Sequence, residues 1–335
     1  MPPGGAPPRG RGIFDRPGWP GPLYRFGMKY RILGSTGLRV SVVGLGTWQF
    51  GGEWGKDFEQ DEVDAMFQRA RELGVNLVDT AECYGDHTSE RLIGQALRNS
   101  GGRREDWILA TKFGHKFLEP FKRQDTRTPQ TVRQEVEASL SALQTDYIDL
   151  LQYHSWGDDD FFKEDVLAEL ARLRDEGKFR HLGNSVGKNT NVEQVGASRE
   201  RGVEFIQIIY NRLQREPEET TFPICREQNL GVLARVPLAS GFLSGKYAPG
   251  HLFESTEVRG VWHRPEDRDA KLREVQEIKR SEYLREVDHQ RTSMATWALA
   301  WCLKNPAVTA VIPGVKNVTQ VEGNAAAADL AMVPA

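Results

Sequence analysis

Four residues that could act together in proton transfer follow three successive apolar runs of the chain. The runs end in Asp79-Thr-Ala-Glu-Cys-Tyr84-Gly, in Ala-Thr-Lys112-Phe-Gly and in Leu-Leu-Gln-Tyr-His154-Ser-Trp. One ionisable residue at the end of a strand is ordinary, because half-buried strands stop where polarity begins. Three such endings in succession favour a shared site, since the carboxyl ends of barrel strands open into one mouth.

A phenol, an ammonium, a carboxylate and an imidazole in one pocket suit the reduction of a carbonyl group by hydride. A free tyrosine has a pKa of about 10, and a neighbouring cation such as Lys112 would lower it toward the working range. Asp79 would supply the counter-charge that a buried ammonium needs. His154 would donate a hydrogen bond to the substrate oxygen and orient it.

The elements that must position these residues are read from alternating apolar and amphipathic stretches. Eight strands are expected at 42–46, 75–79, 107–112, 148–154, 181–186, 205–210, 231–237 and 308–313. Helices are expected at 62–73, from Ser89 onward, and at 129–143, 165–176, 191–201, 217–228 and 318–328, with an extra pair at 266–288 and 293–304. Segments 31–33 and 39–41 flank a Gly-Ser-Thr-Gly turn and predict a hairpin before the first strand.

This order predicts an α/β protein, a (β/α)8 TIM barrel with an N-terminal β-hairpin and extra C-terminal helices. A doubly wound sheet is the alternative, because periodicity alone does not show that a sheet closes. No break in composition divides residues 28–335, so we expect one barrel domain there. Residues 1–27 hold seven of the 17 prolines and seven glycines, which predicts an extended or poorly ordered arm.

Composition excludes several classes of protein. A formal charge of -3 lacks the basic excess that nucleic-acid binding requires, and 39% hydrophobic residues suffice for a large core. The most apolar stretch, 294–303, is too short to cross a bilayer. Three widely spaced cysteines form no disulfide framework or zinc motif, so a soluble cytoplasmic protein is expected. Nothing in the sequence specifies an oligomeric state.

The chain resembles the aldo-keto reductases from residue 28 to about residue 328. The motifs that carry the resemblance are Gly44-Leu-Gly-Thr, Asp79-Thr-Ala-x-x-Tyr84-Gly, Thr-Lys112, Asp149-Leu-Leu-Gln-x-His154, Leu182-Gly-x-Ser185, Ile206-Gln207-x-x-Tyr210-Asn211, Pro237-Leu-Ala-x-Gly-x-Leu-x-Gly-Lys-Tyr and Val311-Ile-Pro-Gly314. The resemblance implies a barrel whose bottom is plugged by the hairpin, and an NAD(P)H-dependent reductase of aldehydes or ketones. It makes Tyr84 the proton donor and Asp79, Lys112 and His154 its catalytic partners.

The resemblance also implies a cofactor site. Ser185 and Gln207 would hold the nicotinamide carboxamide, and residues 314–324 would hold the adenosine phosphate end. The full set of cofactor residues implied is Gly46, Thr47, Ser185, Gln207, Arg235, Pro237, Leu238, Gly241, Leu243, Lys246, Gly314, Lys316, Gln320 and Asn324. Trp48, Trp54, His115 and Trp156 follow strands and are expected to line a mouth for a small carbonyl or alcohol substrate, with loop anchoring as the alternative role.

Some positions depart from the family pattern. Val186 stands where many members have Asn, and Gly314 and Gln320 replace the commoner Lys and Arg near the 2′-phosphate. Lys316 is the remaining cation of that loop, so we favour NADPH (NADP+) with NADH as the second choice. Arg235 replaces an aromatic residue; its guanidinium could cover the nicotinamide ring or pair with a carboxylate.

Other interpretations of the motifs are weaker. Residues 44–49 lack the third glycine of a dinucleotide fingerprint, and residues 240–247 lack the spacing of a phosphate loop. A metal site from Asp79, His87, His115 and His154 is not expected, because Lys112 would repel a divalent cation. The alternative function is that of a cofactor-binding regulatory or redox-sensing subunit with little turnover, since some aldo-keto reductases serve as regulatory subunits of membrane channels.

Overall fold

Eight parallel strands form one sheet that curls into a closed barrel. The computed structural model describes residues 27–254, 257–330 and 332–334. The sheet runs in chain order through β3 (Leu45–Gly46), β4 (Leu77–Asp79), β5 (Ile108–Phe113), β8 (Ile148–His154), β9 (Phe179–Ser185), β10 (Val203–Ile209), β11 (Gly231–Arg235) and β12 (Ala310–Val311), and each strand pairs in parallel with its neighbours. Parallel bridges from Val43 to Val311 and from Gly46 to Gly314 join the first strand to the last. The predicted (β/α)8 barrel is therefore confirmed over the open doubly wound sheet.

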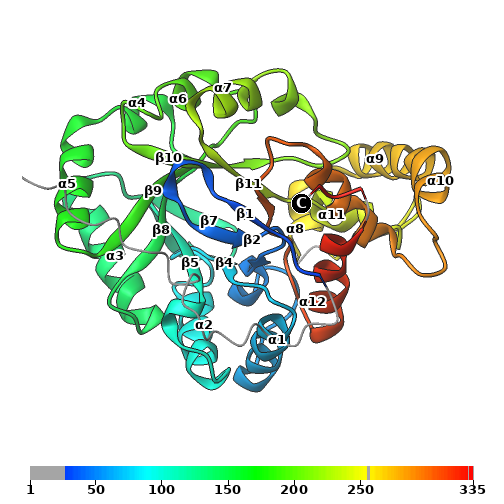
Figure 1. The fold of residues 1–335 in the computed structure, drawn as a ribbon, viewed down its shortest axis with the longest axis horizontal. Coiled ribbons are helices and arrows are strands. Elements are labelled where there is room, and N and C mark those ends of the chain that lie inside the picture. The colour runs from blue at the N-terminus through cyan, green and yellow to red at the C-terminus, as the bar shows by residue number, and fades with distance from the viewer. Residues whose placement is uncertain (1–26, 255–256, 331, 335) are drawn as a thin grey trace, which may run out of the picture.

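Helices surround the barrel, as Figure 1 shows. They are α1 (Gln60–Glu72), α2 (Thr88–Asn99), α3 (Pro129–Leu143), α4 (Asp158–Phe161), α5 (Glu164–Asp175), α6 (Val192–Gly196), α7 (Thr221–Gln228), α8 (Val258–Trp262), α9 (Pro265–Ile278), α10 (Leu284–Glu286), α11 (Met294–Lys304) and α12 (Val318–Ala325). The start of α3 illustrates how the local sequence sets a boundary: the Thr128 side chain accepts a hydrogen bond from the Thr131 amide at 3.2 Å, and Pro129 occupies the first turn. The extra helices α9 and α10 project at one side of the barrel (Figure 1).

The predicted N-terminal hairpin consists of β1 (Tyr30–Ile32) and β2 (Arg39–Ser41), which pair antiparallel. It lies across the centre of the barrel in Figure 1. Leu33 and Val40 are fully buried and belong to the cluster of inward-facing strand residues that fills the barrel, together with Leu150 and Phe205. The hairpin thus closes the end of the barrel where the strands begin, and the opposite end is left for a site.

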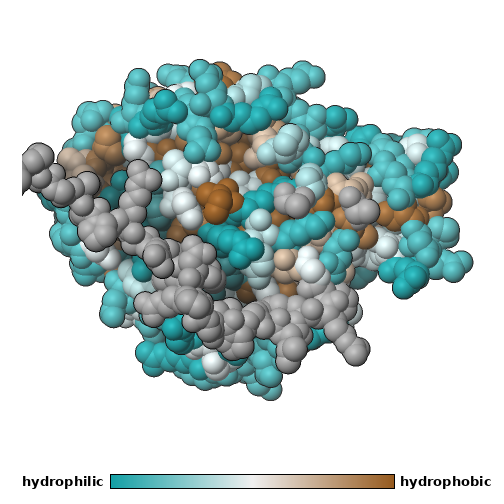
Figure 2. Space-filling view, in the orientation of Figure 1, coloured by the Kyte–Doolittle hydropathy of each residue, from teal (hydrophilic) through white to brown (hydrophobic). Residues whose placement is uncertain are grey.

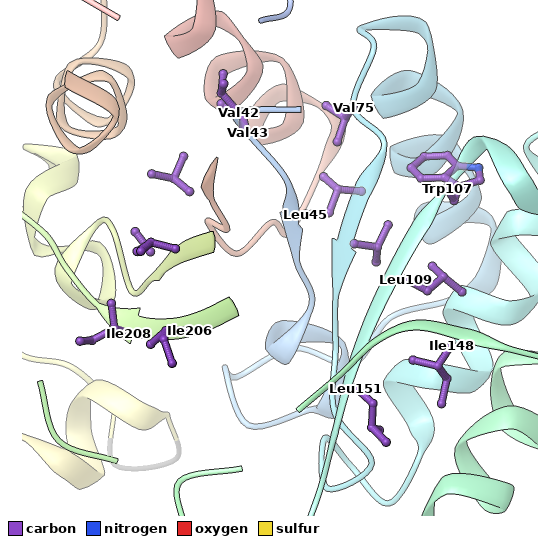
Figure 3. Packing of buried hydrophobic residues seen from close by; sticks show 14 of the residues in the cluster. Val42, Val43, Leu45, Val75, Trp107, Leu109, Ile148, Leu151, Ile206 and Ile208 are labelled. Atoms are coloured by element: carbon purple, nitrogen blue, oxygen red, sulfur yellow. The ribbon is translucent and has the colours of Figure 1, made fainter. Parts of the chain in front are cut away.

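A second, larger apolar layer lies between the strands and the helices. In Figure 3, Leu109 of β5 and Ile148 and Leu151 of β8 lie on the side of the strands where the helices pack. Successive residues of one strand therefore pack in different apolar layers: Leu150 faces the barrel interior, whereas its neighbour Leu151 faces the helices. The two layers hold the strand ends, and with them the polar residues that follow, in fixed positions.

Several elements differ from the sequence-based expectation. Residues that were expected to form a plain loop after the third strand make a second hairpin, β6 (His115–Glu119) and β7 (Lys122–Asp125). The helix expected at 191–201 is only α6, and α7 starts four residues later than the expected start at Pro217 because a 3-10 turn, Glu216–Glu218, precedes it. Short elements of this kind carry too few periodic residues to be recognised from one sequence.

Gly34, in the turn of the N-terminal hairpin, allows the hairpin to pack closely against the start of β11. Its φ is +52°, and a Cβ at this position would lie 2.1 Å from the backbone nitrogen of Gly231 at the start of β11. Gly37, in the same turn, also has a positive φ, +71°, but a Cβ there would meet nothing within 4 Å. We expect Gly34→Ala to lower the free energy of unfolding by about 2 kcal/mol more than Gly37→Ala, measured by urea denaturation. Equal decreases in the free energy of unfolding for the two variants would contradict close packing of the hairpin against β11.

The surface of the face seen in Figure 2 is mostly hydrophilic, with small hydrophobic patches, one of them near the centre of the view. No helix among the described residues is long and apolar enough to cross a membrane. Cys83, Cys225 and Cys302 are free and buried. The arm expected at residues 1–27 lies outside the described residues, apart from Gly27.

Candidate active site

A cavity of about 570 Å³ opens at the end of the barrel where the strands terminate. Asp79, His154, Ser185 and Arg235 are the last residues of β4, β8, β9 and β11, and all of them line it. The predicted residues that line the cavity are Gly46, Thr47, Trp48, Trp54, Asp79, Tyr84, His115, His154, Ser185, Gln207, Arg235, Pro237, Leu238, Gly241, Lys246, Gly314, Lys316, Gln320 and Asn324. The barrel topology thus brings together residues from most of the length of the chain.

Lys112 and Asp79 form a buried ion pair beneath the cavity. The Lys112 Nζ atom lies 2.8 Å from the Asp79 Oδ2 atom and 2.6 Å from the Thr80 carbonyl oxygen. The other carboxylate oxygen of Asp79 accepts hydrogen bonds from the amides of Gln152, at 3.1 Å, and Gln207, at 2.6 Å. Burial alone lowers the pKa of Lys112, but the adjacent Asp79 charge outweighs it, so the net pKa is raised and the ammonium keeps its proton.

Tyr84 lies above this ion pair, with its hydroxyl oxygen 3.4 Å from the Lys112 Nζ atom. Burial raises the pKa of Tyr84 to about 12, and the Lys112 ammonium acts in the opposite direction without overcoming it. This corrects the expectation that Lys112 brings the phenol pKa down toward neutrality: desolvation of the phenolate is the larger effect here. Tyr84 is consequently protonated at neutral pH, which suits it to donate a proton.

His154 stands beside Tyr84, with the ring centroids 6.0 Å apart. Burial, followed by the nearby His115 and Lys112, lowers the pKa of His154 well below its usual value. The imidazole is therefore neutral at neutral pH and carries one N–H donor. Its Nδ1 atom is 3.6 Å from the Cys83 Sγ atom, and the ring of His115 lies 5.0 Å from its own ring.

The cavity wall offers polar groups that fit a nicotinamide dinucleotide. The Arg235 Nε, Arg259 Nε and Asn324 Nδ2 atoms are buried and have no hydrogen-bond partner among the described residues. Arg235 donates to the Val186 carbonyl oxygen at 3.0 Å and forms no ion pair with a described carboxylate, so the carboxylate-paired alternative is not observed. Unpaired buried donors of this kind are costly unless a ligand satisfies them.

The two residues expected at the nicotinamide carboxamide are close together. The Ser185 hydroxyl donates to the Gln207 Oε1 atom at 3.4 Å, while the Gln207 amide nitrogen is already bonded to Asp79. At the other end of the cavity, the Lys316 Nζ atom donates to the Trp54 carbonyl oxygen at 2.7 Å. Burial and the neighbouring Arg259 cation lower the pKa of Lys316, so two cations share this end.

Besides Lys112, which lies beneath the cavity, two predicted residues do not line it. Trp156 is 2% exposed and packs against Phe113 and Tyr153 in the layer between strands and helices. The backbone turns at Ser155, with φ +57°, and Ser155 lines the cavity in its place. Leu243 is fully buried, because it packs against apolar side chains of the extra helices α9 and α11.

Other cavity residues were not included in the predicted set. Phe121 and Arg123 come from the β6–β7 hairpin, and Arg259 and Trp262 come from α8. The ring of Trp262 lies 5.2 Å from that of Trp48 and 6.3 Å from that of Phe121, so these aromatic side chains meet over the cavity. The Glu-Pro pair at the centre of residues 115–125 is the sequence signal for a turn that could have identified the hairpin.

Glu82, Cys83 and His154 form the group of possible metal ligands among the described residues, with ligand atoms within 4.8 Å of one another. This set differs from the one considered from the sequence and shares only His154 with it. The charges of Lys112 and Arg123 both lower the pKa of His154. The same positive field opposes the binding of a divalent cation at this place.

The comparisons with known proteins agree with the geometry. A sequence model of the Aldo/keto reductase family matches residues 42–334. The chain therefore belongs to the aldo/keto reductase family, whose members are NAD(P)H-dependent carbonyl oxidoreductases.

Individual relatives cover most of this chain. It is 32% identical over 306 residues to the aldo-keto reductase YhdN of Bacillus subtilis, covering 88% of this chain and 87% of the relative. It is 30% identical over 317 residues to an NADH-specific methylglyoxal reductase of Escherichia coli, covering 90% and 94%, and 30% identical over 313 residues to a probable voltage-gated potassium channel subunit beta of Arabidopsis thaliana, covering 90% and 92%. Among solved structures, the glycerol dehydrogenase AKR11B4 from Gluconobacter oxydans is similar with a TM-score of 0.73 and 28% identity, covering 90% of this chain and 89% of that one.

Proposed function

We propose that this chain reduces a carbonyl compound, an aldehyde in preference to a ketone, to its alcohol with NADPH as the reductant. The observation that carries the proposal is the hydrogen-bonded series of Asp79, Lys112 and Tyr84 under the cavity. It combines a fixed cation with a protonated phenol, and it presents both to a space of about 570 Å³ that a small substrate and a cofactor can share.

Each residue of the site has a distinct task in this proposal. Tyr84 donates its proton to the substrate oxygen, and the Lys112 ammonium stabilises the phenolate that remains. Asp79 keeps the ammonium charged and in place. His154, a neutral imidazole, donates a hydrogen bond that orients the substrate oxygen. A reduced nicotinamide bound in the cavity would supply the hydride. Oxidation of an alcohol would use the same residues in reverse.

The preference for NADPH rests on the two cations at one end of the cavity. Lys316 and Arg259 both line it, and the Arg259 charge lowers the pKa of Lys316. Arg259 is also paired with Glu257 at 2.7 Å. A 2′-phosphate placed between two such cations would relieve their repulsion through charge-assisted hydrogen bonds. Because one relative is named an NADH-specific reductase, the preference requires its own measurement.

We expect Lys316→Ala to lower the ratio of kcat/KM for NADPH to kcat/KM for NADH by about tenfold or more, which corresponds to one lost charge-assisted contact. Steady-state rates with each cofactor and one common aldehyde measure this ratio. Lys178→Ala is the matched control, since Lys178 lies 3.8 Å from Glu137 and does not line the cavity. A ratio unchanged by Lys316→Ala would refute the assignment of Lys316 to the phosphate.

NADPH oxidation against a panel of aldehydes, ketones and sugars tests the proposed reaction, with a control that lacks substrate. We expect turnover of at least one aldehyde above that control. A chain that binds NADPH and reduces none of the panel would instead fit the regulatory subunit that the sequence left as an alternative.

A further inference from the structure

The cavity contains a cation, Arg123, that the reaction proposed above does not use. Resting on that proposed function, we propose that Arg123 binds an anionic group of the substrate, so that the preferred substrates are aldehydes that carry a carboxylate. Three features of the described residues support this: the position of Arg123, a guanidinium donor that its partner Glu53 leaves unused and the sign of the charges around the cavity.

Arg123 lies on β7 and lines the cavity on the same side as the groups that would hold the carbonyl. Its side chain is 18% exposed. The Cys83 thiol lies against the guanidinium and itself lies 3.6 Å from the His154 Nδ1 atom. The Arg123 charge is also near enough to lower the pKa of His154. A carboxylate on Arg123 would therefore sit close to a carbonyl oxygen held by His154 and Tyr84.

Glu53, the counter-ion of Arg123, also accepts hydrogen bonds from two other groups. One guanidinium nitrogen, Nη2, is bonded to the fully buried carboxylate of Glu53 at 2.5 Å. The same carboxylate accepts hydrogen bonds from the Trp48 indole and from the Phe121 amide, each at 2.6 Å. The other terminal nitrogen of Arg123, Nη1, is buried next to the cavity and makes no hydrogen bond to a described nitrogen or oxygen. Glu53 thus holds the cation in place without using its full hydrogen-bonding capacity, and a guanidinium can bind a carboxylate through two parallel bonds.

The charges that line the cavity are mostly positive. The cationic side chains in its wall are Arg123, Arg235, Lys246, Arg259 and Lys316, of which Arg123 pairs with Glu53 and Arg259 with Glu257. Among the described residues the only acidic one in the wall is Asp79, which Lys112 neutralises. A cavity with one sign of charge concentrates ligands of the opposite sign. On the substrate side the wall is also aromatic, through Trp48, Phe121 and Trp262, so a flat or short carbon chain fits between the carbonyl and its carboxylate.

The experiment compares acids with their neutral esters. The probes are 4-oxobutanoate with methyl 4-oxobutanoate, and 4-formylbenzoate with methyl 4-formylbenzoate, each reduced with NADPH. We expect the wild-type chain to prefer the acid of at least one pair by about tenfold or more in kcat/KM. Arg123→Met should reduce that acid-to-ester ratio by about the same factor. Lys122→Met is the matched control: it removes the same charge from the neighbouring residue, which is 70% exposed and does not line the cavity, and it should leave the ratio unchanged.

Equilibrium binding separates this proposal from the proposed reaction. Titration of 4-formylbenzoate, and separately of its methyl ester, into the chain with NADP+ is followed by tryptophan fluorescence. The acid should bind at least about tenfold more weakly to Arg123→Met than to the wild type, and the ester should bind both equally. If no carbonyl compound is reduced but this difference in binding remains, the reaction is wrong and the anion site stands. If the wild type treats acid and ester alike in both assays, or if Arg123→Met weakens both equally, the anion site is overturned.

Discussion

Replacing Tyr84 by Phe should lower kcat/KM for aldehyde reduction by about 10² to 10⁴ while NADPH affinity changes by less than about threefold. The change removes one hydroxyl group, 3.4 Å from the Lys112 ammonium, and leaves the ring that stacks on Trp48 with centroids 6.0 Å apart. Because burial keeps the phenol protonated, with a pKa of about 12, Tyr84 is the group in the cavity best suited to donate a proton at neutral pH. Steady-state rates and a fluorescence titration with NADPH measure the two quantities.

Tyr153→Phe provides the control for this experiment. Tyr153 precedes His154 on β8, is fully buried and lies outside the cavity, so its hydroxyl has no access to a substrate. We expect this variant to keep wild-type turnover. Turnover of Tyr84→Phe close to that of the wild type would contradict the role of Tyr84 as proton donor.

Replacing Lys112 by Met should have two separable effects. Reduction should slow by about 10² or more, because the phenolate that forms on Tyr84 would lose its cation. The free energy of unfolding at pH 7 should fall by about 3 kcal/mol, because the Asp79 carboxylate would remain buried without its counter-ion. Rates of aldehyde reduction and urea denaturation measure these effects independently.

The dependence of the free energy of unfolding on pH shows which charge state of Lys112 stabilises the fold. In the wild type the pKa of Lys112 is raised, so its contribution is fully present below the pKa of an unfolded lysine and is lost only as the pH rises through the higher folded value. The difference in stability between the wild type and Lys112→Met should therefore be constant below the pKa of an unfolded lysine and shrink as the pH rises through the raised pKa of Lys112. A loss of stability that is independent of pH would contradict a charge effect.

The double variant Asp79→Asn, Lys112→Met distinguishes charge from packing. It removes both charges and keeps an amide oxygen that can accept from Gln152 or Gln207. We expect it to recover part of the stability that Lys112→Met loses, since no buried charge is left unpaired. It should not recover activity, because the cation beside Tyr84 is still missing.

These predictions share one physical basis, the position of a neutral acid beside a fixed cation in a dry cavity. Tyr84 is kept neutral by burial, and Lys112 is kept charged by Asp79. Burial favours the neutral form of both groups. The ammonium stays charged because a carboxylate lies 2.8 Å away, whereas the Lys112 charge does not overcome the effect of burial on the phenol. Such an arrangement stabilises the charge that forms during proton transfer without a large rearrangement.

The sequence by itself was sufficient to predict the barrel and the convergence of Asp79, Tyr84, Lys112 and His154. Apolar runs with helical segments between them specify repeated strand–helix units, and the rule that barrel strands open at their carboxyl ends then brings residues 33 and 42 positions apart into one site. Periodicity alone left a doubly wound sheet open as the alternative, so the expected closure of the barrel depended on the motifs shared with the aldo-keto reductases as well.

Only the tertiary structure decided which neighbouring side chain faces the cavity and how strongly each acid is perturbed. At the end of β8 the backbone turn places Ser155 in the cavity wall and buries Trp156, and no local pattern distinguishes these two outcomes. Arg123 enters the cavity because Glu53, 70 residues earlier, holds the hairpin and Trp48 together. The pKa of Tyr84 depends on the balance between burial and a cation, and both terms are set by packing among distant segments rather than by the order of residues along the chain.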